Sequence, residues 1–280
     1  MLVLRSISEV KEQLKKLQNN GKTIGFVPTM GYLHEGHLSL LKESKKNNDI
    51  SVLSIFVNPT QFGPNEDLDK YPRNEEKDLE LAKSVGVNLV FIPDVEEMYK
   101  GPNTTVSVSD LTNFLCGKSR PTHFNGVTTV VNKLFNIVRP DNAYFGQKDA
   151  QQAIIIIKMV EDLDMDVKVN VCPIVREPDG LAMSSRNVYL DEVQRKEALV
   201  LRSSLKEAKN RFINGEKSTK DLKGFITEMI NEKVTANIDY IEIVDFKTLK
   251  DIDEIERKAL IAVAVKFGKT RLIDNIILEA

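Results

Sequence analysis

Apolar residues recur along the first half of the chain with two alternating patterns. Short uninterrupted apolar runs predict five strands, at 23–27, 50–57, 88–92, 143–146 and 167–171. Between them, apolar positions three or four residues apart predict helices after Ser6 and at 36–46, 75–85, 127–138 and 149–162. Apolar strands that alternate with helices are typical of a mostly parallel sheet covered on both faces.

The pattern changes after about residue 175. Two long charged helices are predicted at 191–213 and 218–233, followed by strands at 238–244, 259–267 and 270–278. Gly268 and Lys269 separate the last two strands and suit a tight hairpin. We therefore predict an α/β protein with a Rossmann-like, nucleotidyltransferase-type domain at 1–175 and a smaller α+β domain, a lid, at 176–280.

Composition and charge exclude several classes of protein. The 280 residues carry a formal net charge of -2, which argues against a nucleic-acid partner. The longest apolar runs, 153–157 and 259–265, are far shorter than the ~18–20 residues that span a bilayer, and no signal peptide is evident. Cys116 and Cys172 are too few for a disulfide framework or a cysteine zinc site. We expect a cytoplasmic protein with inert thiols and no membrane partner.

Two of the three histidines, His34 and His37, lie one helical turn apart in the segment that follows the first strand. Glycines at 31 and 36 allow close backbone approach, and a helix that begins here offers N–H groups to an anion. Imidazole can also donate to phosphate oxygens. The alternatives are two structural histidines or a zinc site, although zincins space their ligands i, i+4 and only His123 could add a third. The pattern favours phosphate chemistry on a nucleotide, without zinc.

The usual phosphate loops are missing from the sequence. Three G-K-[ST] tripeptides begin at Gly21, Gly117 and Gly268, but none has a glycine five positions earlier, as a Walker A loop requires. No G-x-G-x-x-G follows a predicted strand, which argues against a dinucleotide-dependent oxidoreductase.

Polar segments also follow the second and fourth strands. In the loop at 58–73, Asn58 and Gln61 can donate and accept hydrogen bonds, as a hydroxy acid requires. The segment 145–152 combines Gly146 with Lys148 and Gln152, which suits a phosphate and a polar substrate. Either segment alone could be an ordinary surface loop.

A third polar segment, 176–187, lies at the predicted domain boundary. Ser184, Ser185 and Arg186 could surround a triphosphate with donors, and the position suits a hinge that closes over a ligand. The alternative is a polar interdomain linker. His123, in P-T-H-F-N-G, is more simply read as a structural residue.

Taken together, these segments resemble the pantothenate synthetases, the pantoate–β-alanine ligases. The motifs occur in the family's order along nearly the whole chain: P-T-M-G-Y-L-H-E-G-H, F-V-N-P-T-Q-F, D-L-D-K-Y-P-R, H-F-N-G-V-T-T-V-V, F-G-Q-K-D-A-Q-Q and D-G-L-A-M-S-S-R-N. The departures are Gln147, where the family more often has glutamate, and Tyr32, where alanine is common.

The resemblance implies that ATP and Mg²⁺ drive the condensation of pantoate with β-alanine through a pantoyl adenylate, with release of AMP and pyrophosphate. It also implies a homodimer. Catalytic roles fall on His37, His34, Lys148, Ser184, Ser185 and Arg186. The implied ATP contacts are Met30, Gly31, Tyr32, Leu33, His34, Glu35, Gly36, His37, Gly146, Gln147, Lys148, Asp149, Val175, Met183, Ser184, Ser185 and Arg186. Gln61 and Gln152 would bind pantoate, and Gln61 would also lie near β-alanine.

The resemblance leaves two other functions to be tested. One is a related adenylyltransferase with a different acceptor, such as a nicotinamide mononucleotide adenylyltransferase. The other is an ATP-sensing module without turnover. The ligase interpretation depends on one expectation, that the paired imidazoles, the Lys148–Asp149 pair and Ser184–Arg186 meet around a single triphosphate.

Overall fold

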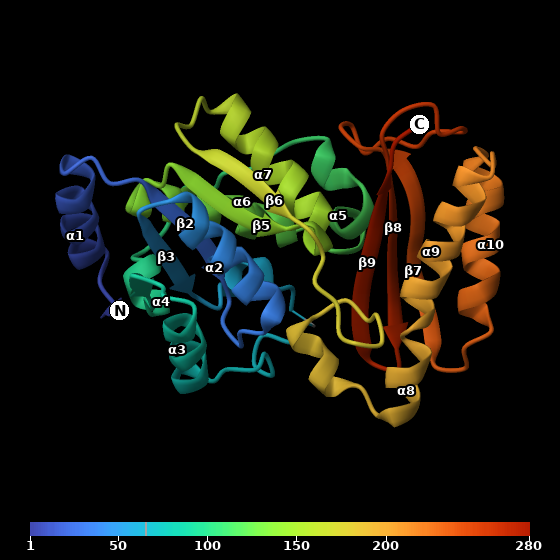
Figure 1. Cartoon of the computed structure of the whole chain (residues 1–280), viewed down its shortest axis with the longest axis horizontal. Helices are drawn as coiled ribbons and strands as arrows, with labels where there is room; N and C mark the ends of the chain where they lie inside the picture. Colours follow the sequence, from blue (N-terminus) through green and yellow to red (C-terminus); the bar gives the residue numbers. More distant parts are fainter. Residues whose placement is uncertain (65) are drawn as a thin grey trace. The chain divides into compact units, whose positions relative to one another are not determined.

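The computed structural model describes residues 1–64 and 66–280, so Asn65 of the predicted polar loop at 58–73 lies outside the described residues. The chain forms two compact units (Figure 1). Unit 1 comprises 1–109, 120–147 and 152–173, and unit 2 comprises 110–119, 148–151 and 174–280. Unit 2 thus takes two short segments from the first half of the chain. The single cut near residue 175 stays a prediction.

Unit 1 is built on a six-stranded sheet in which every neighbouring pair is parallel. The strand order is β1-β4-β3-β2-β5-β6. The bounds are β1 Leu2–Leu4, β2 Ile24–Thr29, β3 Ile50–Ile55, β4 Leu89–Phe91, β5 Asn142–Gly146 and β6 Lys168–Cys172. The five predicted strands are confirmed. β1 was not predicted, because a three-residue strand leaves no periodicity to recognise.

Helices cover both faces of this sheet, as predicted. The long ones are α1 Ile7–Asn19, α2 Glu35–Asn47, α3 Glu75–Ser84, α6 His123–Val138 and α7 Ala150–Asp162, with a short α4 at Val95–Met98. In β2, Phe26 meets Phe135 of α6 edge-on, whereas Val27 packs in a cluster with Leu41 of α2. Because successive strand residues point to opposite faces, α6 and α2 lie on opposite sides of the sheet.

The strand order reverses at β2. From β2 the chain adds β3 and then β4 on one side, and it later returns to add β5 and β6 on the other. In open parallel sheets, ligands bind at the carboxyl ends of the strands where the order reverses. This switch point lies between β2 and β5.

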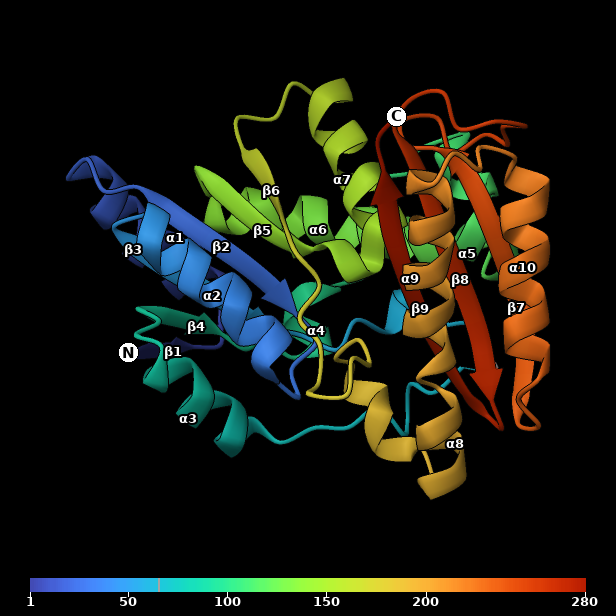
Figure 2. The same ribbon diagram turned by 45° about the vertical axis from the view of Figure 1, so that its right-hand side comes forward.

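Unit 2 contains a three-stranded antiparallel sheet, β7 Ala236–Asp245, β8 Ala259–Phe267 and β9 Thr270–Leu278. One face of it is covered by α9 Val200–Ile213 and α10 Thr219–Asn231 (Figure 2). Their apolar stripes, with Leu201 and Ile226 at the centre, pack on alternate residues of β8 such as Val263. Unit 2 also includes α5 Leu115–Ser119 and the 3-10 turns Leu111–Asn113 and Ser185–Tyr189.

The predicted single helix at 191–213 is wrong. The segment forms α8 Glu192–Glu197 and, after a turn at 198–199, α9. At the junction the backbone hydrogen bonds join residues three positions apart instead of four. The N–H of Leu199 donates to the carbonyl of Lys196, and the N–H of Leu201 donates to that of Ala198. Neither proline nor glycine marks this junction, so the sequence pattern conceals it.

Two further observations concern the predicted class. Cys116 and Cys172 are both buried and form no disulfide, and burial raises the pKa of the Cys172 thiol. Within residues 1–64 and 66–280, none of the helices has both the length and the apolar character needed to cross a bilayer.

Candidate functional site

The turn between β2 and α2 holds the paired histidines and has a constrained backbone. Gly31 has a φ of 80° and Tyr32 a φ of 50°, a left-handed conformation that non-glycine residues rarely adopt. The buried carboxylate of Asp78 accepts the N–H groups of Tyr32 at 2.8 Å and Leu33 at 2.6 Å. A Cβ on Gly31 would lie 2.9 Å from that carboxylate, so only glycine fits there. Burial raises the pKa of Asp78, although these two hydrogen bonds oppose the shift.

Both imidazoles form part of the helix start. His34 is the N-cap of α2, and its Nδ1 accepts the N–H of Gly36 at 3.1 Å. The Nδ1 atom of His37 accepts the N–H of His34 at 3.3 Å, and the two ring centres are 4.1 Å apart. A neutral ring that accepts at Nδ1 carries its proton on Nε2. The backbone thereby selects the tautomer in which Nε2–H is the donor.

Among residues 1–64 and 66–280, no three or more His, Cys, Asp or Glu side chains are grouped so that they could hold a metal ion. The Nδ1 atoms of His34 and His37 already accept backbone N–H groups, which suits anion recognition at a helix N-terminus.

Gln61 lies in the turn that follows β3, Pro59–Gln61, and its side chain reaches the histidine turn. Its Nε2 is 2.9 Å from the sulfur of Met30, and its Oε1 accepts from Asn58 at 3.2 Å. The parallel pairing of β2 with β3, which ends at Thr29 and Ile55, brings these two turns to one edge of the sheet. The loop after β3 and the histidine turn after β2 therefore lie side by side.

Residues at and just before the start of α6 contact the backbone of the Pro59–Gln61 turn. His123 Nδ1 lies 2.9 Å from the carbonyl oxygen of Gln61, and Arg120 donates to the same oxygen at 3.3 Å. A Cβ on Gly126 would lie 2.4 Å from the carbonyl oxygen of Thr60, so the helix and the turn touch backbone to backbone. The structural interpretation of His123 therefore fits. Arg120 was not singled out from the sequence.

Arg120 is held in turn by Glu66. Its guanidinium donates twice to that carboxylate, at 2.7 and 2.5 Å, and both side chains are less than one quarter exposed. Burial alone would raise the pKa of Glu66, but the hydrogen bonds and charge of Arg120 lower it. The pair stays ionised and keeps the guanidinium on the Gln61 carbonyl.

The segment after β5 divides between the units. Gly146 ends β5 next to β2, and Gln152 lies half-buried in α7; both belong to unit 1. Lys148 and Asp149 belong to unit 2, with 3.8 Å between the ammonium and the carboxylate. Only 21% of the Lys148 side chain is exposed, so its stem is well packed.

In unit 2, the segment at 175–187 is folded back on itself. Met183 N–H donates to Val175 O at 3.0 Å, and Glu177 N–H donates to Leu181 O at 2.8 Å. Ser184 then caps the 3-10 turn Ser185–Tyr189, its Oγ accepting from the N–H of Arg186 at 3.3 Å. The three residues Ser184–Arg186 thus sit at the start of a helical turn, where N–H groups favour an anion.

A comparison with known families decides the assignment. The family model described as pantoate-beta-alanine ligase matches residues 2–277. The chain belongs to this family. All six sequence motifs lie within the matched range.

Named relatives agree with the family assignment. A protein named pantothenate synthetase from Acetivibrio thermocellus is 58% identical over 280 residues, which cover 100% of both chains. The crystal structure of pantothenate synthetase from Thermus thermophilus has a TM-score of 0.94 at 43% identity and covers 99% of each chain. That of the Francisella tularensis pantoate-beta-alanine ligase, complexed with β-γ ATP and β-alanine, has a TM-score of 0.79 at 34% identity, covering 99% of this chain and 97% of that one.

Proposed function

We propose that the chain condenses pantoate with β-alanine, using ATP, through a pantoyl adenylate that releases pyrophosphate first and AMP second. The observation that supports this most directly is the pair of imidazoles at the N-terminus of α2, at the switch point of the sheet, each with Nδ1 engaged by the backbone. The Francisella relative, complexed with β-γ ATP and β-alanine, supports the same substrates.

From the resemblance to the family, we assign the following residues to ATP: Met30–His37, Gly146, Gln147, Lys148, Asp149, Val175 and Met183–Arg186. His37, His34, Lys148, Ser184, Ser185 and Arg186 carry the phosphate chemistry. A structure with bound nucleotide in which only one of these groups contacted the phosphates would overturn the assignment.

We assign pantoate to Gln61 and Gln152, and β-alanine to the neighbourhood of Gln61. A buried glutamine can accept from a hydroxyl and donate to a carboxylate at the same time. The side chain of Gln61 is already oriented by Asn58 and Met30, and its main chain by His123. Little ordering would then be needed when pantoate binds.

The first step joins two anions. The pantoate carboxylate attacks the α-phosphorus, and the bond to pyrophosphate breaks while negative charge grows on the leaving oxygens. Donors already fixed around the phosphates stabilise this charge without reorganising, and one such donor is worth roughly 10²–10³ in rate. The Nε2–H groups of His34 and His37 and the ammonium of Lys148 would serve in this way.

The second step forms the amide. The amine of β-alanine attacks the acyl carbon of the adenylate, AMP leaves, and the amine loses a proton. The mixed anhydride is a reactive acyl donor, so holding the two reactants in contact supplies most of the acceleration. No strong base is needed once β-alanine is bound with its amine deprotonated.

The donors assigned to the phosphates are cationic, N–H or O–H groups, and the described residues contain no cluster of three or more His, Cys, Asp or Glu that could hold a metal ion. This donor set fits Mg²⁺ held mainly by the phosphate oxygens of ATP rather than by a protein cage. Bound there, the ion would neutralise part of the phosphate charge. Metal analysis that found stoichiometric zinc on His34 and His37 would contradict the phosphate role.

The test is to incubate the protein with ATP, Mg²⁺, pantoate and β-alanine and to measure AMP, pyrophosphate and pantothenate. We expect all three in equal amounts. His37→Ala and Lys148→Ala should each slow pantoate-dependent pyrophosphate release by at least ~10²-fold. A dinucleotide product would favour an adenylyltransferase, ATP binding without turnover would favour a sensing module, and near-normal rates in the variants would refute the two roles.

We further propose a cytoplasmic homodimer, as the resemblance implies, in which 176–280 acts as a lid. Light scattering coupled to size-exclusion chromatography tests the dimer directly. A monomer at micromolar concentration with full activity would contradict it.

A further inference from the structure

Strand β9 carries two adjacent buried polar residues within the otherwise apolar stretch 272–278. Asp274 is 2% exposed and Asn275 is 3% exposed, and both stand between isoleucines, Ile273 and Ile276. Burial of a carboxylate and an amide is costly unless both are hydrogen-bonded. Both are hydrogen-bonded, and their partners lie in the two segments of unit 2 assigned to ATP.

Asp274 is bound to Arg176 through two parallel contacts. Arg176 Nη1 donates to Oδ2 at 2.6 Å, and Nη2 donates to Oδ1 at 2.9 Å. Oδ1 also accepts the backbone N–H of Asn275 at 2.8 Å. A paired, bidentate geometry of this kind fixes the guanidinium in both position and orientation.

Arg176 also forms hydrogen bonds within its own segment, 175–187, and so links that segment to β9. Its Nη1 also donates to the carbonyl of Gly180 at 3.2 Å, and its backbone pairs with Ala182 across the fold-back. Met183 follows Ala182 in the sequence, and its N–H donates to the carbonyl of Val175. The placement of Met183–Arg186 therefore depends on the pair that Arg176 forms with β9.

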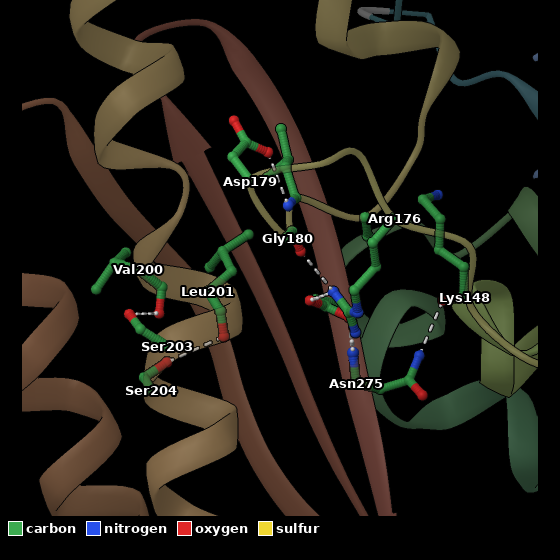
Figure 3. A network of polar contacts seen from close by, with 12 residues as sticks. Lys148, Arg176, Asp179, Gly180, Val200, Leu201, Ser203, Ser204 and Asn275 are labelled. Atoms are coloured by element: carbon green, nitrogen blue, oxygen red, sulfur yellow. Dashed lines mark hydrogen bonds and ion pairs between the residues drawn. The ribbon is translucent and has the colours of Figure 1, made fainter.

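Asn275 holds the second segment. Its Nδ2 donates to the carbonyl oxygen of Lys148 at 3.0 Å, across 127 positions of the sequence (Figure 3). Lys148 and Ser184 thus owe their backbone positions to two consecutive residues of one strand. Because that strand is a rigid element paired with β8 along its whole length, the two segments are held in a constant spacing.

We propose that Asp274 and Asn275 are positioning residues for the nucleotide. They hold Lys148 and Met183–Arg186 in the spacing that the phosphates of ATP require, without touching the nucleotide themselves. This inference rests on the proposed function, which assigns those two segments to ATP.

The test compares Asp274→Asn and Asn275→Leu with the wild type. Asp274→Asn leaves Arg176 with one good acceptor, and Asn275→Leu removes the donor to Lys148 at similar size. The matched control is Asp245→Asn, because Asp245 is also a buried aspartate of the same sheet, 6% exposed, that accepts from Thr248. The measurements are the Kd of ATP by calorimetry, the KM values of ATP and pantoate, and the Tm.

We expect both β9 variants to raise the Kd and KM of ATP by about 10- to 100-fold, the scale of a misplacement of about 1 Å, while the KM of pantoate changes less than twofold. Asp245→Asn should lower the Tm but leave ATP binding unchanged. Unchanged ATP binding in both β9 variants, or an equal loss in the Asp245 control, would overturn the inference. If Asp274→Asn does not fold, Asn275→Leu decides.

The two hypotheses fail separately. Wild-type protein that binds ATP but makes no pantothenate would refute the proposed function, and the Kd comparison would still decide the role of β9. Wild-type protein that binds no ATP would refute both.

Discussion

The carboxylate of Asp78, in α3, accepts the backbone N–H of Leu33 at 2.6 Å, although the two residues are 45 positions apart in the sequence. Its other oxygen accepts the N–H of Tyr32, which has a left-handed φ of 50°. A non-glycine residue keeps such a conformation only when the surroundings compensate for a cost of order 1–3 kcal/mol. Asp78 therefore holds the backbone that leads into His34 in its unusual shape.

Replacement of Asp78 by asparagine should impair the histidine turn. The amide offers one acceptor oxygen where two N–H groups need one each, and its NH₂ group faces the second donor. We expect pantoate-dependent pyrophosphate release to fall by at least ~10-fold. Steady-state kinetics checks this, with Glu76→Gln on the exposed side of the same helix as control. Equal rates in the two variants would show that the turn does not need Asp78.

Replacement of His37 by asparagine should distinguish the structural role of Nδ1 from the chemical role of Nε2–H. The amide oxygen can take the place of Nδ1 and accept the N–H of His34, but nothing replaces Nε2–H. We expect a Tm within a few degrees of the wild type and a loss of about 10² in adenylate formation. In His37→Ala both atoms are lost, so the Tm should fall as well. Rapid-quench measurement of the adenylate together with calorimetry distinguishes the outcomes, and an active Asn variant would assign the chemistry to another donor.

Two helical glycines should respond in opposite directions to alanine. In Gly126→Ala, the new Cβ would lie 2.4 Å from the carbonyl oxygen of Thr60, so the turn that carries Gln61 must move. The clash should outweigh the gain in helix propensity of about 1 kcal/mol, lower the free energy of unfolding by ~1–3 kcal/mol and raise the KM of pantoate. Gly224 in α10 has no atom within 4 Å of that position, so Gly224→Ala should be stabilising. Urea unfolding of both variants provides the comparison, and a stabilised Gly126→Ala would contradict the described contact.

Asp49 should make the stability depend on acid pH. Its carboxylate accepts from the backbone and hydroxyl of Thr23 and from Lys22, and these bonds lower its pKa from 3.8 to about 2. A depressed pKa favours the folded state above pH 3.8, and this contribution is lost as the pH falls from 3.8 toward 2. The advantage of the wild type over Asp49→Asn should therefore shrink across that interval and be constant near pH 7. An advantage that did not change with pH would exclude the ionised contact. Asp78, whose pKa is raised, should contribute with the opposite sign.

The features that could be predicted from the sequence are those that depend on residues close together in the chain. The strands at 259–267 and 270–278 match β8 and β9 to the residue, because apolar runs bounded by Gly268 leave no other choice. The meeting of the Met30 and Gln61 turns could also be predicted, since both follow adjacent parallel strands.

Contacts between distant segments could not be predicted in this way. Asp78, Arg120 and Asp274 look like ordinary charged residues of a helix, a loop and a strand, and their partners lie 45 to 98 positions away. The residues 110–119 and 148–151 join unit 2 for the same reason, since their partners, such as Asn275 for Lys148, come much later in the chain. The missed break at 198–199 is different, since there the backbone changes its bonding with no local signal.

The dependence of Lys148 and Arg176 on β9 has a consequence for synthesis on the ribosome. Chains grow from the amino end, and domains generally fold as they emerge. The sheet of unit 1 is complete once β6 has left the ribosome. The partners of Lys148 and Arg176 in β9, however, are synthesised only 127 and 98 residues later. A nascent chain stalled before β9 could therefore carry the histidine turn in its final form while still being unable to grip a nucleotide.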